Sequence, residues 1–411
     1  MPATLHEVKV QEHSIPVIFE QDTHLPLVSL QLVFENSGAL TDRIAGLAKL
    51  SSKLLGEGTK TMGSEAFAEA LESRAITLDA SVGAETFVIS LHALKSEFFF
   101  GLEMLLQLLQ DPNDTEEAFG KVQTQTIGML TQKQSDFDYV ANLLLKSVLF
   151  EGSARAYPSS GTVESVSRIT LQDIQRHIVD HLGLNNLIVV LGGDFEEREV
   201  TEIVAQVAAI LPVVSVSPLD VIVAREEPTT VTKHAATEQA YLYFGAPYHM
   251  PYDSSALHLG KVASFVLGSS GFGSRLMEEI RVKRGLAYSA YANFSVNRTG
   301  SYFTGHLQTK LESADEAKAV VSEVLEEYIR EGITHEELDA AKQFLIGSEP
   351  LRNETLQQRI GNAFNAYYSG KPLDYRTREL QLIEAIKLEE INAFISSHAE
   401  IGKLSFAVVK D

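Results

Sequence analysis

The stretch LGSSGFGSRLMEEIRVKRGLAYSAY, residues 267–291, places a glycine-rich loop, a helical segment and a strand-like segment in direct succession. Apolar residues in SRLMEEIRVK recur at helical spacing, whereas AYSAYANFSV alternates in the manner of a strand. The glycines at 268, 271 and 273 form the pattern GxxGxG, which matches neither the P-loop nor the dinucleotide-binding pattern. The stretch therefore predicts a loop, a helix and a strand, and nucleotide binding is not expected.

The rest of the chain runs twice through one order of elements, in which strands and helices follow each other in an α+β pattern. DTEEAFGKV pairs with THEELDAAK, and ITLQDIQRHI pairs with IKLEEINAFI, at offsets of about 220 and 217 residues. A period near 200 residues indicates duplicated domains and not a solenoid of short units. We expect domains at residues 1–215 and 226–411, joined by a proline-containing linker around 211–230 that lacks a helical period.

Composition limits the chemistry that this protein can perform. The chain has 411 residues, 45% hydrophobic, and no cysteine, which excludes disulfides, thiolate zinc sites and cysteine nucleophiles. Its net charge of −21 repels nucleic acid and anionic membranes, so neither is expected as a partner. The N-terminal stretch lacks the basic start and apolar core of a signal peptide, and no apolar run is long enough to span a membrane. We therefore expect a soluble protein in the cytoplasm, with export left open.

The segment GLAKLSSKLLGEGT, residues 46–59, has the pattern of a helix that ends near Gly58. Leu47, Leu50 and Leu54 fall on one face, and Lys49, Ser52 and Lys53 fall on the other. If the two lysines were histidines and the serine a glutamate, the polar face would form HxxEH, the pattern of a zinc hydrolase. Taken alone, the segment also fits an amphipathic surface helix with a solvated lysine face.

Three stretches together resemble the M16 peptidase family, which includes mitochondrial processing peptidase, pitrilysin and insulin-degrading enzyme. They are GLAKLSSKLLGEGT (46–59), YPSSGTVESVSRIT (157–170) and, most closely, the stretch 267–291, so they occur in both expected domains. The resemblance implies two homologous domains of the LuxS/MPP-like metallohydrolase type. Each is expected to contain an antiparallel-rich sheet packed with helices.

Active members of this family hold zinc with two histidines and a distal glutamate, and a second glutamate acts as the base. Lys49, Ser52 and Lys53 stand at the three HxxEH positions here, and residues 118–135, where the distal glutamate would fall, contain no acid. An ammonium group has no lone pair for Zn²⁺, and a serine hydroxyl is too weak a base to replace a carboxylate. We therefore expect no metal in this chain and no activity when it is alone.

The resemblance also implies a role for an arginine and a tyrosine seven residues apart, which in this family contact the substrate backbone and assist the oxyanion. Arg281 and Tyr288 have that spacing, and Arg284 is a less well spaced alternative. From the pattern alone, Arg281 could be a cation at a helix end, and Tyr288 could be a core residue on the same strand face as Ala290 and Ala292. Both functional groups act without a metal, so a zinc-free chain can supply them to a partner.

One histidine pair imitates the missing motif elsewhere. His177 and His181 enclose Asp180 in the pattern HxxDH, but they flank the apolar stripe of a predicted helix that begins after Thr170. The corresponding position in the second repeat is Phe394, which indicates a packing role for His177. No third ligand is apparent.

Three hypotheses follow. The first is a non-catalytic subunit that pairs with a homologous zinc-bearing M16 chain and contributes Arg281 and Tyr288 to peptide substrate binding. The second is a structural scaffold, as in the core subunits of the cytochrome bc1 complex. The third is an independent hydrolase that uses His177 and His181.

Overall fold

The computed structural model describes residues 2–10 and 12–411, and the chain forms two compact units. The first unit contains the chain up to Thr131 together with Pro158–Leu219 and Arg352–Tyr368. The second contains Gln132–Tyr157, Asp220–Leu351 and Ser369–Asp411. Each unit is built on one sheet, so the expected α+β class with two sheet-and-helix domains is confirmed.

The first unit contains a six-stranded sheet in the order β1-β2-β6-β3-β5-β4. Its strands are β1 (Thr4–Val10), β2 (His13–Gln21), β3 (Leu27–Glu35), β4 (Thr77–Val82), β5 (Thr86–Leu94) and β6 (Leu187–Gly193). Only the β2–β6 pair is parallel, and the remaining pairs are antiparallel. β6 is buried along its whole length, as expected for the apolar run LIVVLGG in the middle of a sheet.

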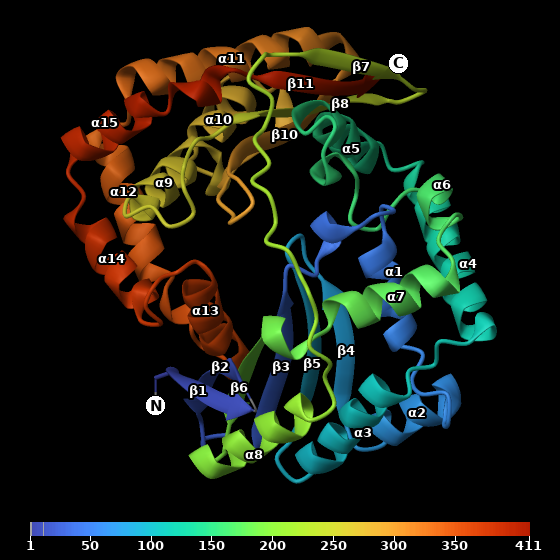
Figure 1. Cartoon of the computed structure of the whole chain (residues 1–411). Helices are drawn as coiled ribbons and strands as arrows, with labels where there is room; N and C mark the ends of the chain where they lie inside the picture. Colours follow the sequence, from blue (N-terminus) through green and yellow to red (C-terminus); the bar gives the residue numbers. More distant parts are fainter. Residues whose placement is uncertain (1, 11) are drawn as a thin grey trace. The chain divides into compact units, whose positions relative to one another are not determined.

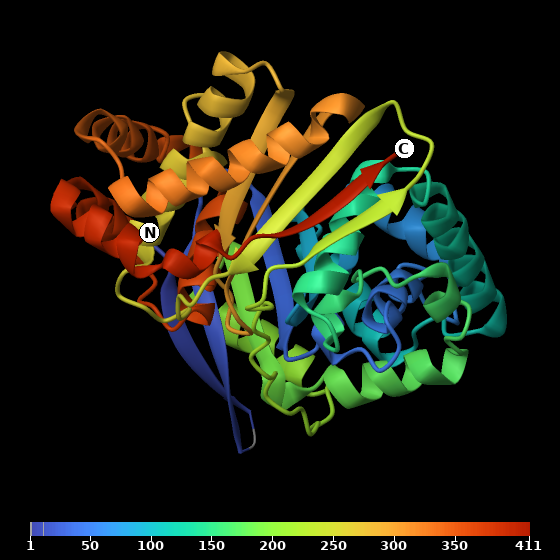
Figure 2. The ribbon, with the colours of Figure 1, turned by 90° about the horizontal axis from the view of Figure 1, so that it is seen from above.

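The second unit contains a five-stranded sheet in the order β7-β11-β8-β10-β9. Its strands are β7 (Thr230–His234), β8 (Gln239–Pro247), β9 (Ala287–Ser295), β10 (Tyr302–Lys310) and β11 (Ser405–Lys410). Figure 2 shows β11, in red, between its two neighbours. Only the β11–β7 pair is parallel. Without β1, the two sheets therefore have the same strand order and directions, which is the structural form of the sequence repeat.

Helices cover both sheets. Those of the first unit are α1 (Leu47–Leu55), α2 (Gly63–Glu72), α3 (Phe98–Gln110), α4 (Glu116–Lys133), α6 (Val163–Val166), α7 (Leu171–His181), α8 (Glu197–Ala208) and α13 (Leu356–Tyr368). Those of the second unit are α5 (Phe137–Leu149), α9 (Leu257–Ser264), α10 (Arg275–Met277), α11 (Ala314–Glu331), α12 (His335–Gly347), α14 (Tyr375–Ala385) and α15 (Leu388–Ser397). Two π-helical segments, Phe265–Ser269 and Glu278–Lys283, continue α9 and α10.

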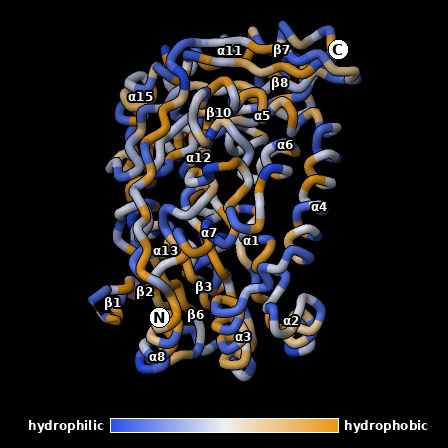
Figure 3. The backbone as a smooth tube through the Cα atoms, turned by 45° about the vertical axis from the view of Figure 1, so that its right-hand side comes forward, coloured by the Kyte–Doolittle hydropathy of each residue, from blue (hydrophilic) through white to orange (hydrophobic). Residues whose placement is uncertain are grey.

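The helix starts follow the offsets of the repeat. α4 and α12 begin 219 residues apart, as do α5 and α13, whereas α7 and α15 begin 217 residues apart. Thr170 caps α7 with a reciprocal capping box, as the sequence predicts. Figure 3 shows hydrophilic and hydrophobic turns alternating along α4, whose apolar side packs against α1. None of the helices described is long and apolar enough to cross a membrane.

The two halves of the chain exchange one helix each. α5 comes from the first half but packs on the sheet of the second unit, and α13 comes from the second half but packs on β2 and β6 of the first (Figure 1). Glycines in the receiving sheets make room: a Cβ at Gly245 would lie 2.6 Å from Leu149 of α5, and one at Gly192 would lie 3.0 Å from Leu356 of α13. The boundaries 1–215 and 226–411 remain a prediction for the repeat, and the compact units are not continuous in sequence.

The connection between the repeats has no regular structure. Residues 211–229 form neither helix nor strand, and β7 begins at Thr230, close to the end of the expected linker. Sequence patterns did not reveal β1, β4 or β7, which lie at the edges of the sheets. Edge strands are exposed on more sides than central ones, so their apolar pattern is weaker.

Candidate functional site

Arg281 and Tyr288 lie together on the second unit. The guanidinium carbon of Arg281 lies 4.4 Å from the centroid of the Tyr288 ring, within the range of a cation–π contact. Arg281 belongs to the π-helical segment Glu278–Lys283, and Tyr288 is the second residue of β9. Wide helical turns of this kind occur frequently at functional sites.

A β-bulge turns Tyr288 away from the core. Ala290 pairs with Leu307 and Ala287 pairs with Thr309, so β9 has one more residue than β10 between these two pairs. The extra residue breaks the two-residue alternation, and Ala287 and Ala290 are both buried while Tyr288 is 81% exposed. The alternative that the sequence pattern allowed, in which Tyr288 is a core residue of its strand, is therefore wrong.

A third side chain completes this cluster. The ring of Phe272 lies 4.6 Å from the guanidinium carbon of Arg281 and is 70% exposed. Phe272 stands between Gly271 and Gly273, which have φ angles of 70° and 87°, a region that favours glycine. Sequence reasoning noticed these glycines but missed the aromatic residue between them. Arg284, the alternative to Arg281, instead lies 3.6 Å from Glu323 in an exposed ion pair.

Helix α1 carries Lys49, Ser52 and Lys53, the three residues that the sequence places at the HxxEH positions. The helix begins at Leu47, after Gly46 in a left-handed conformation, and its leucines pack against α4. Ser52 is only 2% exposed and its hydroxyl donates to the carbonyl of Lys49. Ser52 is therefore enclosed, whereas Lys49 and Lys53 remain partly exposed, so the solvated face that the sequence pattern allowed is limited to the two lysines.

Lys53 connects α1 to the helix where a distal ligand would stand. Its Nζ donates to Thr126 Oγ1 of α4 at 2.9 Å. Two lysines, a serine and a threonine offer Zn²⁺ no imidazole and no carboxylate, so these residues do not fit the ion. Within residues 2–10 and 12–411, no group of three histidine, aspartate or glutamate side chains has the geometry to hold a metal.

Comparisons with known proteins show which family the chain belongs to. A family model described as "Peptidase M16 inactive domain" matches residues 168–345. Over 410 residues, which cover 100% of this chain and 95% of the relative, the sequence is 39% identical to "Non-peptidase homolog YmxG" of Helicobacter pylori. The chain belongs to the M16 peptidase family. The descriptions of this relative and of the family model fit an M16 member without catalytic zinc.

Solved structures show the same fold. The "peptidase M16 inactive domain from Pseudomonas fluorescens" superposes with a TM-score of 0.91 at 23% identity, covering 99% of this chain and 98% of that chain. A structure described as "a protease from Helicobacter pylori" superposes with a TM-score of 0.86 at 15% identity over the full length of both chains. The M16 fold is thus complete here although its metal motif is absent.

The histidine pair of this M16 chain lies on α7 and is largely internal. His177 is 4% exposed, its ring stacks on that of His181 at 4.3 Å, and its Nε2 has no hydrogen-bond partner among the residues that the structure describes. Burial, together with the charges of His181 and Arg43, lowers the pKa of His177 to about 3. Because the described part of the chain offers no third ligand beside this neutral, enclosed imidazole, the structure gives no support to an independent hydrolase.

His177 is expected to make the protein sensitive to acid. Because its pKa is lower in the folded chain than in the unfolded chain, the unfolded state binds the proton first below about pH 6.5, and stability falls from there towards pH 3. At pH 5 the proton uptake by this one histidine should lower the free energy of unfolding by about 2 kcal/mol. His177→Phe, which copies Phe394 of the second repeat, should remove most of this loss when denaturant unfolding is measured at pH 7 and pH 5. The exposed His335→Phe serves as the control, and an unchanged pH dependence in His177→Phe would contradict the assignment.

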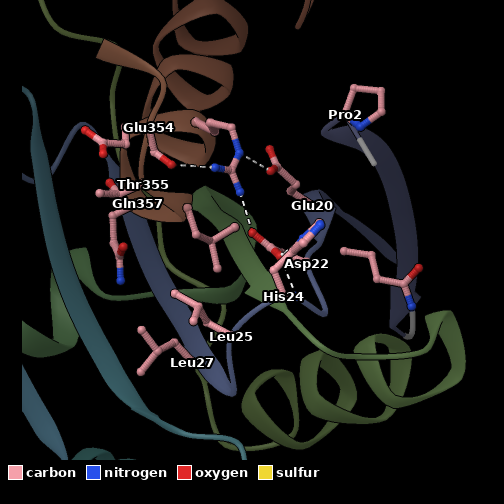
Figure 4. Close-up of a pocket in the computed structure, with 12 residues that line it drawn as sticks. Pro2, Glu20, Asp22, His24, Leu25, Leu27, Glu354, Thr355 and Gln357 are labelled. Atoms are coloured by element: carbon pink, nitrogen blue, oxygen red, sulfur yellow. Dashed lines mark hydrogen bonds and ion pairs between the residues drawn. The ribbon is translucent and has the colours of Figure 1, made fainter. Parts of the chain in front are cut away.

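A cavity of about 640 Å³ lies in the first unit, beside the exchanged helix α13. Arg359 of α13 donates from Nε to Glu20 and from Nη2 to Asp22, both at 2.5 Å, and Figure 4 shows the carboxylates of Glu20 and Asp22 turned toward this guanidinium. Nη1 donates to the carbonyl of Glu354. The guanidinium is thus fully engaged within the unit, which assigns it a structural role in fastening α13 to β2.

Proposed function

We propose that this chain is the non-catalytic subunit of a heterodimeric M16-type zinc endopeptidase and contributes Arg281 and Tyr288 to the partner's active site. The observation that carries the proposal is the contact between these two side chains on an exposed surface, with Tyr288 turned outward by a bulge. A tyrosine that is 81% exposed does nothing for a core, so its orientation is better explained by binding.

Both side chains can act on a peptide held by another chain. A guanidinium offers several N–H donors to a carbonyl or carboxylate, and a phenol hydroxyl can donate to the negative charge that develops on a carbonyl oxygen. Neither group needs a metal on its own chain. The zinc, the base and the attacking water would come from the partner.

The partner must be a different polypeptide. A second copy of this chain would again present Lys49, Ser52 and Lys53, which cannot bind zinc. To find the partner, the tagged chain is isolated under gentle conditions from its native source and co-purifying proteins are identified by mass spectrometry. We expect a homologous chain that carries HxxEH, and the isolated complex should contain zinc and cleave peptides.

In that complex, Arg281→Ala and Tyr288→Ala are each expected to reduce kcat/KM by about 10²-fold, the usual cost of removing a donor to an oxyanion. Arg198→Ala and Tyr157→Ala, which alter exposed residues of the same types, provide matched controls. Unchanged rates in the Arg281 and Tyr288 variants, with zinc and the partner still bound, would contradict the proposal.

The second candidate is a structural scaffold, favoured by the loss of every zinc-binding and base position on α1 and α4. As a scaffold the chain would bind its partners without contacting substrate. Recovery of only itself, or of assembly proteins without HxxEH, would favour this alternative.

A further inference from the structure

We infer that Phe272 is a positioning residue for Arg281, and that Phe272 and Tyr288 together hold the guanidinium ready for a carbonyl or carboxylate oxygen of a peptide. The inference rests on the proposed function. It adds one residue that neither the motif spacing nor the helix and strand patterns indicate.

Geometry on the surface supports this role. The guanidinium carbon of Arg281 lies 4.6 Å from the Phe272 ring and 4.4 Å from the Tyr288 ring, and both rings remain mostly exposed. Core packing therefore does not explain why the three side chains meet. Contact with two ring faces restrains a long, flexible side chain while its N–H groups can still donate in the guanidinium plane. A restrained donor loses less conformational freedom when substrate binds.

Gly271 and Gly273 determine the conformation of the loop that carries Phe272. A Cβ at Gly271 or Gly273 would meet no atom of the described residues within 4 Å, so space does not require glycine at either position. Their positive φ angles do, because other L-residues rarely adopt them. The two glycines thus set the turn that places Phe272 over Arg281. Gly273→Ala should disturb the same contact without altering either aromatic side chain.

The contact itself can be tested on the isolated chain. In a protein labelled with ¹⁵N-arginine, the Nε–H signal of Arg281 is identified by its loss in Arg281→Lys. We expect ring currents to displace this signal from the position typical of exposed arginines, and Phe272→Ala to move it back towards that position. Phe272→Tyr should preserve the displacement, and Phe99→Ala, at a half-exposed phenylalanine elsewhere, should leave it unchanged. An identical Arg281 signal in wild type and Phe272→Ala would overturn the inference without affecting the proposed function.

Peptide cleavage by the complex tests the consequence. Phe272→Ala is expected to lower kcat/KM about 5- to 10-fold, mainly through KM, and Phe272→Tyr should restore it. If Phe272 acts through Arg281, Phe272→Ala should have less than about a twofold effect in an Arg281→Ala background. An equally large effect in that background would show that Phe272 acts independently and would overturn the inference. A silent Arg281→Ala would instead refute the proposed function, and this inference with it.

Discussion

Zinc binding is expected to appear when Lys49→His, Ser52→Glu, Lys53→His and Thr126→Glu are combined. The hydrogen bond of 2.9 Å between Lys53 and Thr126 shows that α1 and α4 lie close enough for side chains of both helices to bind one metal ion. Positions 49 and 53 are one helical turn apart, so two imidazoles there would face the same ion. The variant should bind one Zn²⁺ per chain at least 100-fold more tightly than wild type in a calorimetric titration, and metal analysis should agree.

The stability of the metal-free variant and zinc binding by a triple variant test this prediction further. Ser52 is 2% exposed, so a glutamate at this position brings a carboxylate into an enclosed site and should destabilise the metal-free variant. Zinc should restore that stability, giving a melting temperature that rises with zinc concentration. The triple variant with Thr126 retained lacks the third protein ligand and should bind more weakly. A folded quadruple variant that binds zinc no better than wild type would show that the helices are not placed as a metal site.

Replacing Arg359 with methionine is expected to lower the free energy of unfolding by about 3 kcal/mol, because it leaves two carboxylates without their cation. With Arg359 in place, the Glu20 side chain is 6% exposed and that of Asp22 is 18% exposed, so both carboxylates are largely withdrawn from solvent and depend on the guanidinium as their cation. Hydrogen bonds from His24 and Arg359 lower the pKa of Asp22 to about 2. Denaturant unfolding at pH 7 measures the loss.

Neutralising the whole cluster provides the informative control. In Glu20→Gln/Asp22→Asn/Arg359→Met no charge remains buried, so most of the loss should be recovered. Arg378→Met, which breaks an ion pair between exposed side chains, should change stability by less than about 0.5 kcal/mol. The low pKa of Asp22 also predicts that wild type loses stability as pH falls from about 4 towards 2. If Arg359→Met were as stable as wild type, this ion pair would not fasten α13.

Much of the fold was predictable because its signals are local. Apolar runs such as LIVVLGG indicated the central strands, and Thr170 indicated the start of α7, since capping depends on a few neighbouring residues. The positions of α5 and α13 were not predictable in this way. An apolar helix face indicates that a helix is covered, but it does not indicate by which sheet.

The same distinction between local sequence signals and long-range packing applies to the candidate site. By itself, the sequence determined that Lys49, Ser52 and Lys53 stand where HxxEH would require two histidines and a glutamate, that Arg281 and Tyr288 lie seven residues apart, and that the order of elements is repeated, because residue identity and spacing are covalent properties. Only the tertiary structure decided that Tyr288 faces outward, that Phe272 joins Arg281, and that each half lends the other a helix. These outcomes depend on the register between β9 and β10, on backbone φ angles at two glycines and on close packing against Gly192 and Gly245, all of which arise only when distant segments meet.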